Sequence, residues 1–386
     1  MVYQTGFARW AASDKEAMPL AGLLGSGFVR GSTALVFDPA TATTSGPAPQ
    51  GLPSREKQKL KYCEILSPDI TTGFPAFEAI PSWNSRTAEG SWATIEVSAR
   101  MDGVWSRWYD HGIWSTSPST IEARSAANSQ PGVATGTKTL GDPGRVATDT
   151  LILSRPAQAF RVRIRLFAME GAKAPGLGSL SLAWSSPKPA IAPETSAPAF
   201  RGYLIEGVPA WSQMIYPDGG NVWCSPTSLS MVMAYWINRA GGTHPDEETF
   251  IRMTVAGVFD AEYQGHGNWS FNVAWAGERG FSASVRRFSS LSELEPIVAG
   301  GSPIILSLSW DNEAGRTLFG APLARSRGHL EVLVGFDEKG NPIVNEPASP
   351  DDASVRRVYH RAEFEARWLE ASGGATYIVG PNAGWA

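Results

Sequence analysis

Cysteine and histidine are scarce in this sequence, which has two Cys and five His among its 386 residues. Cys63 and Cys224 stand far apart, in regions of different composition. This arrangement excludes a disulfide framework and a cysteine-rich metal site. We therefore expect no metal and no cofactor, and each histidine can be considered separately as a partner for a reactive thiol.

Long apolar runs and blocks of like charge are also absent. No run approaches the ~20 apolar residues that span a bilayer, so no transmembrane segment is predicted. The formal net charge of −4 is spread along the chain, which argues against a nucleic-acid partner. Residues 1–40 contain no charged segment followed by an apolar one, so no signal peptide is visible. The expectation is a cytoplasmic protein, or a secreted one whose leader is not in this chain.

The length favours two domains, and composition changes suggest where the first one lies. Residues 1–58 are rich in small residues and Pro, with weak periodicity, and are predicted to be an irregular N-terminal segment. Residues 59–186 contain short alternating segments, with a hairpin signal at Asp102-Gly103. This pattern is typical of an all-β sandwich, here predicted as jelly-roll-like.

Aromatic residues are concentrated in this first domain, between Trp83 and Trp114. Flat rings can stack on sugars, which would make the sandwich a binding domain for a glycan or cell wall. The alternative is a sheet core with aromatic cross-strand pairs.

Residues 187–200 form a Pro-, Ala- and Ser-rich linker, and residues 201–386 mix longer helical segments with strands. This mixture predicts an α+β domain with an antiparallel sheet. Helices are expected at 224–238, 245–254, 268–279, 291–299 and 361–371. Strands are expected at 283–288, 303–309, 329–337, 342–346, 354–359 and 375–379.

Cys224 lies where a loop runs into the first of these helices. Pro226 fits the first helical turn, so Cys224 stands at or just before the helix N-terminus. Unpaired N–H groups and the helix dipole favour a negative charge there, and the thiolate is the nucleophilic form of cysteine. The alternative is a small, inert cysteine that caps a core helix.

His329 is the strongest candidate for the base that such a thiol requires. It follows Gly328 near the start of an apolar strand, and the next strand returns through a short turn to Asn345 and Glu346. Either of these two side chains could accept the imidazole N–H and fix its tautomer. Adjacent strand residues face opposite sides, so only one of them can do so.

These residues resemble the C39-type, papain-like cysteine peptidases, and more closely a C39-like bacterial family that usually reads Cys-Gly-Pro-Thr-Ser and Val-Asn-Asp-Pro-Ala. The corresponding segments here are Cys224-Ser-Pro-Thr-Ser, Gly-His329-Leu-Glu-Val and Val-Asn-Glu-Pro-Ala, with Gln213 upstream. The resemblance covers residues 205–380. The first half resembles the β-sandwich that precedes this peptidase domain in some bacterial members.

The resemblance implies a papain-like fold for residues 201–386 and a role for each matching residue. Cys224 matches the nucleophile and His329 the general base. Gln213 matches the glutamine whose side-chain amide helps to form the oxyanion hole. Asn345 follows His329 at the interval of many papain-like enzymes, whereas Glu346 takes the place of the family's Asp before Pro, and we favour Glu346.

The expected function is cleavage of a peptide or amide bond in a peptide or protein substrate, through an acyl-enzyme on Cys224. Two alternatives stay open. An acyl transferase would use the same nucleophile and pass the acyl group to an amine or thiol. A catalytically inactive protein would bind glycan or cell wall through the aromatic sandwich.

Overall fold

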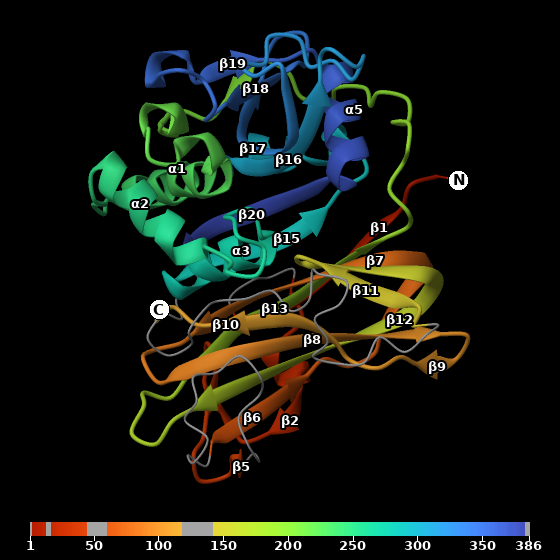
Figure 1. The fold of residues 1–386 in the computed structure, drawn as a ribbon, viewed down its shortest axis with the longest axis vertical. Coiled ribbons are helices and arrows are strands. Elements are labelled where there is room, and N and C mark those ends of the chain that lie inside the picture. Colours follow the sequence, from red (N-terminus) through yellow and green to blue (C-terminus); the bar gives the residue numbers. More distant parts are fainter. Residues whose placement is uncertain (1, 13–16, 45–59, 118–141, 383–386) are drawn as a thin grey trace. The chain divides into compact units, whose positions relative to one another are not determined.

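The computed structural model describes residues 2–12, 17–44, 60–117 and 142–382, and it divides into two compact units (Figure 1). The strand-rich unit comprises residues 6–186 and 259–284. The mixed unit comprises residues 187–258 and 285–381, with the first five residues of the chain.

Thirteen strands of the described residues form one hydrogen-bonded sheet network in the strand-rich unit. The strands are β1 (Thr5–Ala11), β2 (Leu24–Ser26), β3 (Phe28–Arg30), β4 (Leu35–Phe37), β5 (Thr43–Thr44), β6 (Lys61–Leu66), β7 (Ile70–Arg86), β8 (Ser91–Met101), β9 (Val104–Trp105), β10 (Tyr109–Trp114), β11 (Gly144–Ala147), β12 (Thr150–Ala168) and β13 (Gly176–Ser185). Their main order is β10-β8-β12-β7-β13-β4-β3. The long strand β12 also pairs with β6 and β11, and β1 pairs with β13.

The predicted hairpin turn lies between β8 and β9. Met101 pairs with Val104, and the intervening Asp102 and Gly103 have φ values of 50° and 81°. Two successive positive φ values match the twist of the flanking strands, which explains the Asp-Gly sequence.

Most of the aromatic residues of this region belong to the core. Trp83, Trp92 and Trp114 are fully buried, and Trp92 stacks on Phe167 with ring centroids 5.2 Å apart. Trp105 is half-buried, with the Arg161 guanidinium 4.1 Å from its ring centroid. The glycan contact therefore stays a prediction without an exposed aromatic platform to support it.

The N-terminal part of this unit differs from the expected irregular segment. Strands β1 to β5 occupy parts of residues 5–44. Strands β2 and β5 pair with β6, β1 and β4 pair with β13, and β3 pairs with β4. Their short length and small residues gave little periodicity to detect. The remaining residues of the expected segment, 45–58, lie outside the described residues.

Helix α3 (Trp269–Glu278) also belongs to the strand-rich unit, although its sequence lies within the range expected for the second domain. It packs on β7, where the Asn84 side-chain amide donates to Val273 O of α3 at 3.4 Å. The Glu278 carboxylate accepts from the Thr87 hydroxyl at 2.7 Å and from Trp114 Nε1 at 3.1 Å. Burial raises the pKa of Glu278 to about 7.

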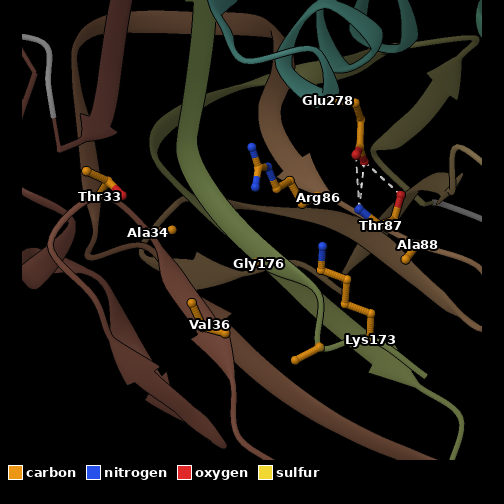
Figure 2. A pocket seen from close by; sticks show the side chains of 10 residues that line it. Thr33, Ala34, Val36, Arg86, Thr87, Ala88, Lys173, Gly176 and Glu278 are labelled. Carbon is orange, nitrogen blue, oxygen red and sulfur yellow. Dashed lines mark hydrogen bonds between the residues drawn. The ribbon is translucent and has the colours of Figure 1, made fainter. Parts of the chain in front are cut away.

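A pocket lies beside Glu278 and Thr87 (Figure 2). Arg86 and Lys173 contribute cationic side chains to its lining. None of the ten residues that line it is aromatic, so it differs from the stacking surface that a glycan-binding sandwich would need.

The mixed unit is built on a seven-stranded antiparallel sheet with the order β15-β20-β16-β17-β18-β19, and β14 pairs with β17. The strands are β14 (Tyr203–Leu204), β15 (Phe281–Arg287), β16 (Ile304–Asp311), β17 (Arg325–Phe336), β18 (Pro342–Asn345), β19 (Arg356–Val358) and β20 (Ala375–Asn382). The α-helices are α1 (Cys224–Arg239), α2 (Glu247–Val258), α4 (Glu295–Ala299) and α5 (Arg361–Ser372). These elements agree closely with the ranges expected from the sequence.

Helix α1 packs on β17 and on α2, whereas α5 packs on β16 (Figure 1). All residues from Ser225 to Trp236 are buried, so α1 is a core helix on every side. The Ser225 hydroxyl lies 2.9 Å from the Tyr377 hydroxyl, which gives its polar group a partner within the core. Among the described residues, no helix combines the length and apolar character that crossing a bilayer requires.

Candidate functional site

Cys224 is the first residue of α1, and it is partly buried. The helix has no side-chain cap at this end, since Trp223 precedes it and contributes only its backbone carbonyl, which accepts from Thr227 N at 3.0 Å. The first N–H groups of a helix carry partial positive charge. The sulfur of Cys224 is therefore placed where a thiolate is favoured.

His329 lies in β17, opposite Leu308 of β16, with only 2% of its surface exposed. The Trp310 ring packs edge-on against the imidazole, with centroids 5.2 Å apart and planes at 87°. Trp310 is itself fixed, because its Nε1 donates to Leu323 O at 2.8 Å. The imidazole is thus held in one orientation and shielded from water.

The side chains of Cys224, His329 and Glu346 come together at one place. Nε2 of His329 lies 2.5 Å from Oε1 of Glu346, and the imidazole is near enough to the Cys224 thiol to lower the pKa of that thiol. Since Nε2 is engaged by the carboxylate, Nδ1 is the nitrogen left for the sulfur.

Electrostatics in this group favour an ion pair. Burial opposes ionisation of Cys224, but the hydrogen bond and charge of His329 outweigh it and leave the pKa of the thiol below its ordinary value. Burial likewise disfavours the charged imidazole, but the Glu346 carboxylate and the thiol raise the pKa of His329 well above its ordinary value. Thiolate and imidazolium stabilise each other here.

Glu346 and Asn345 occupy different environments, as adjacent strand residues must. Oε1 of Glu346 accepts from Ala348 N at 2.8 Å as well as contacting His329, and the carboxylate is fully buried. The Asn345 amide instead donates to Pro209 O at 2.7 Å and accepts from Arg356 Nε at 2.6 Å. The structure thus brings Glu346, and not Asn345, to His329.

Gln213 opens the short 3₁₀ helix η2 (Gln213–Ile215), and its side chain is 2% exposed. Nε2 donates to Gly220 O at 2.6 Å, which leaves one of its two N–H groups for another acceptor. A Cβ on Gly220 would stand 1.9 Å from Gln213 O, so this loop requires glycine where it folds back on Gln213. Within the described residues no hydrogen bond links Gln213 to Cys224, and its oxyanion role stays a prediction.

Trp310 and Glu331 also lie at this site, and the sequence analysis did not predict either of them. Trp310 gave no signal, because an aromatic residue in a buried strand is ordinary. Glu331 did give one: it stands in an otherwise apolar strand, two residues after His329 and therefore on the same face.

Glu331, with His329 and Glu346, also has the spacing of a metal-binding group, since one ligand atom from each lies within 4.8 Å of the others. Nε2 of His329 hydrogen-bonds the Glu346 carboxylate, so it presents an N–H and not a lone pair on that side. The donor set therefore does not fit a metal while this contact holds.

Alanine substitution of Glu346 is expected to lower catalytic activity, whereas alanine substitution of Asn345 is expected to lower stability. Glu346→Ala removes the partner of His329 and should lower kcat/KM by roughly 10²-fold or more. Asn345→Ala removes hydrogen bonds remote from the imidazole and should lower the free energy of unfolding by about 1–3 kcal/mol with kcat/KM little changed. Steady-state kinetics and urea unfolding of both variants measure this contrast, and equal kinetic losses would contradict it.

Comparison with known proteins found matches to two family models and to a solved structure. Residues 205–376 match the Peptidase_C39 like family, and residues 7–185 match the peptidase C39 N-terminal domain. Residues 205–376 belong to the C39-like peptidase family. This C39-like protein is also similar to a solved structure described as a C39-like peptidase from Bacillus anthracis, at 17% identity and a TM-score of 0.34, covering 47% of this chain and 100% of that one.

A search of curated proteins gave no match. The family supports a peptidase-type function for this C39-like protein in broad terms. The chemistry of the site has to be argued from its own residues.

Proposed function

We propose that this C39-like protein is a cysteine peptidase in which Cys224 is the nucleophile, His329 the general base and acid, and Glu346 the residue that orients the imidazole. One observation carries the proposal: the buried imidazole of His329 lies 2.5 Å from the Glu346 carboxylate and near enough to the Cys224 thiol to lower its pKa. This is the nucleophile, base and orienter arrangement of acyl-transfer enzymes. We also propose a papain-like fold for the mixed unit and a jelly-roll-like sandwich for the strand-rich unit.

The first half-reaction forms the acyl-enzyme. The Cys224 thiolate attacks the peptide carbonyl carbon, a C–S bond forms, and the carbonyl electrons move to oxygen. The backbone N–H of Cys224, at the start of α1, is a donor for that oxyanion, and the second N–H of Gln213 is a further candidate. As the C–N bond breaks, His329 gives its proton to the leaving amine.

The second half-reaction restores the enzyme. His329, now neutral, takes a proton from water, and the resulting hydroxide adds to the thioester. The carboxylic product leaves, and the thiolate and imidazolium form again. Glu346 stays ionised throughout and holds the imidazole between its two partners.

Mass spectrometry of a broad peptide library incubated with the full chain tests this proposal. We expect fragments with free carboxylates, together with a covalent adduct on Cys224 when a thiol-reactive peptide is supplied. Added amine nucleophiles distinguish an acyl transferase from a hydrolase, because the products of a transferase would carry the amine in place of a hydroxyl group. Intact peptides and no adduct would support the inactive binding protein and contradict the proposal.

A further inference from the structure

Glu331 is a buried acid that the proposed reaction does not use. It lies two residues after His329 in β17, so both side chains project from the same face of the strand. None of its surface is exposed to solvent, and its neighbours Leu330 and Val332 are buried and apolar. A carboxyl group in such a place needs a partner, because burying an unpaired charge is costly.

Among the described residues, the titratable and charged groups that act on this carboxyl are Glu346, His329, Arg357 and Tyr359. An oxygen of Glu331 lies within 4.8 Å of both a Glu346 oxygen and a His329 nitrogen. Neither Glu331 oxygen accepts a hydrogen bond from any described N–H or hydroxyl group. Arg357 is the cation that also acts on Glu331, but its guanidinium donates elsewhere, to Ser349 Oγ at 2.9 Å and Gly320 O at 2.8 Å.

Glu346, by contrast, has the partners that an ionised carboxylate needs. It accepts from Ala348 N at 2.8 Å and from the Tyr359 hydroxyl at 3.3 Å, and it faces His329. Two adjacent carboxylates in a buried site do not both ionise, and a hydrogen bond between them requires that one carries a proton. The partners identify Glu346 as the ionised member.

We propose that Glu331 is a neutral carboxylic acid that donates its proton in a hydrogen bond to Glu346, and is thus a positioning residue that keeps Glu346 ionised and aimed at His329. The electrostatics agree. Burial and the charge of Glu346 raise the pKa of Glu331 well above its ordinary value. Burial works against ionisation of Glu346 too, but His329 and the donated hydrogen bonds outweigh it and hold the pKa of Glu346 below its ordinary value.

The consequence is a line of four groups, in which Glu331 fixes Glu346, Glu346 orients His329, and His329 activates Cys224. Environments that push the pKa values of two neighbouring acids apart assign one as acid and the other as base. The effect on Cys224 rests on the proposed function. The protonation state of Glu331 does not, so the two can be tested separately.

The pH dependence of stability tests the protonation state without any substrate. The pKa of Glu331 is raised in the folded protein, so the folded chain binds a proton that the unfolded chain releases above about pH 4.5. The contribution of this bound proton to the free energy of unfolding therefore becomes smaller as pH rises above about 4.5. Glu331→Gln retains the shape and a donor N–H but has no proton to lose.

We therefore expect the Tm of Glu331→Gln relative to wild type to increase steadily between about pH 4.5 and about pH 8. A difference in Tm that does not change with pH would overturn the proposal, because it would mean that Glu331 ionises as it does in the unfolded chain.

Infrared difference spectroscopy provides a direct readout. At mildly alkaline pH, above the pKa of about 7 of Glu278, the C=O stretch of a buried carboxylic acid should be present in wild type and absent from Glu331→Gln. Glu278→Gln is the matched control, because Glu278 is a second buried glutamate with a raised pKa, and it lies in the strand-rich unit. Loss of the same band in the control alone would contradict the assignment to Glu331.

Alkylation of Cys224 by iodoacetamide measures the positioning role. Glu331→Gln should keep the wild-type rate and pH profile, whereas Glu331→Met, which cannot donate, should react roughly tenfold more slowly, as expected for loss of one hydrogen bond to a charged group. An unreactive Cys224 in wild type would defeat the proposed function while leaving the infrared result valid. Elemental analysis that found one divalent metal ion per chain in wild type and none in Glu331→Gln would contradict the proposal. It would mean that a cation, and not a proton, lies between Glu331 and Glu346.

Discussion

Cys224→Ala is expected to lower peptide hydrolysis by at least about 10⁴-fold and to abolish labelling of the chain by iodoacetamide at neutral pH. The reason is that the acyl-enzyme has no other atom on which to form. Folding should be unaffected, because Cys224 is only partly buried and alanine is a strong helix former at the start of α1.

Cys63 makes this measurement internally controlled. It is 1% exposed in β6, and burial raises the pKa of its thiol to about 12, so the thiolate is almost absent at neutral pH. Peptide mapping after labelling should show Cys224 modified and Cys63 untouched. Cys63→Ser should keep both hydrolysis and labelling, and a chain labelled at Cys63 in preference to Cys224 would contradict the proposed nucleophile.

His329→Gln is expected to uncouple the thiol from its base. Glutamine retains an N–H for Glu346, which guards against a buried unpaired charge, but it cannot take or return a proton. Without the imidazolium, burial is the main influence on Cys224, and the pKa of its thiol should move upward from its lowered value.

The alkylation rate of Cys224, followed from about pH 5 to about pH 10, brackets the ordinary thiol pKa of about 8.5 and records this change. Wild type should react with a midpoint below that value, and His329→Gln with a midpoint at or above it. Hydrolysis should fall by about 10⁴-fold at every pH, because the leaving amine no longer receives a proton. Unchanged midpoints would mean that His329 does not share a charge with Cys224.

The sequence was most informative about the positions of Cys224 and His329, the proposed nucleophile and base. The loop-to-helix pattern around Pro226 predicted that Cys224 begins a helix, and α1 begins there. The glycine and apolar run around His329 predicted a strand, and β17 contains it. Both predictions depended on short-range patterns, which a sequence displays directly.

Contacts between strands were harder to predict. The order of Asn345 and Glu346 along the chain does not say which of them faces His329, and the preference for Glu346 depended on the family resemblance. The bonds of Asn345 to Pro209 and Arg356, which no periodicity reveals, distinguish the two residues. Glu331 was missed for a related reason, since its significance depends on burial beside Glu346.

Helix α3 has a consequence for how this protein must fold. It is encoded between α2 and β15, yet the partners of its Val273 carbonyl and its Glu278 carboxylate are Asn84 of β7 and Thr87, the residue after β7. A polypeptide cut at residue 201 would keep the proposed nucleophile, base and orienter but leave Glu278 and the buried face of α3 without those partners. The two family matches divide the sequence at one place, between residues 185 and 205. In the structure, residues 259–284 belong again to the strand-rich unit. We therefore expect that residues 201–386 alone would not fold stably, and that they need the first half of the chain to do so.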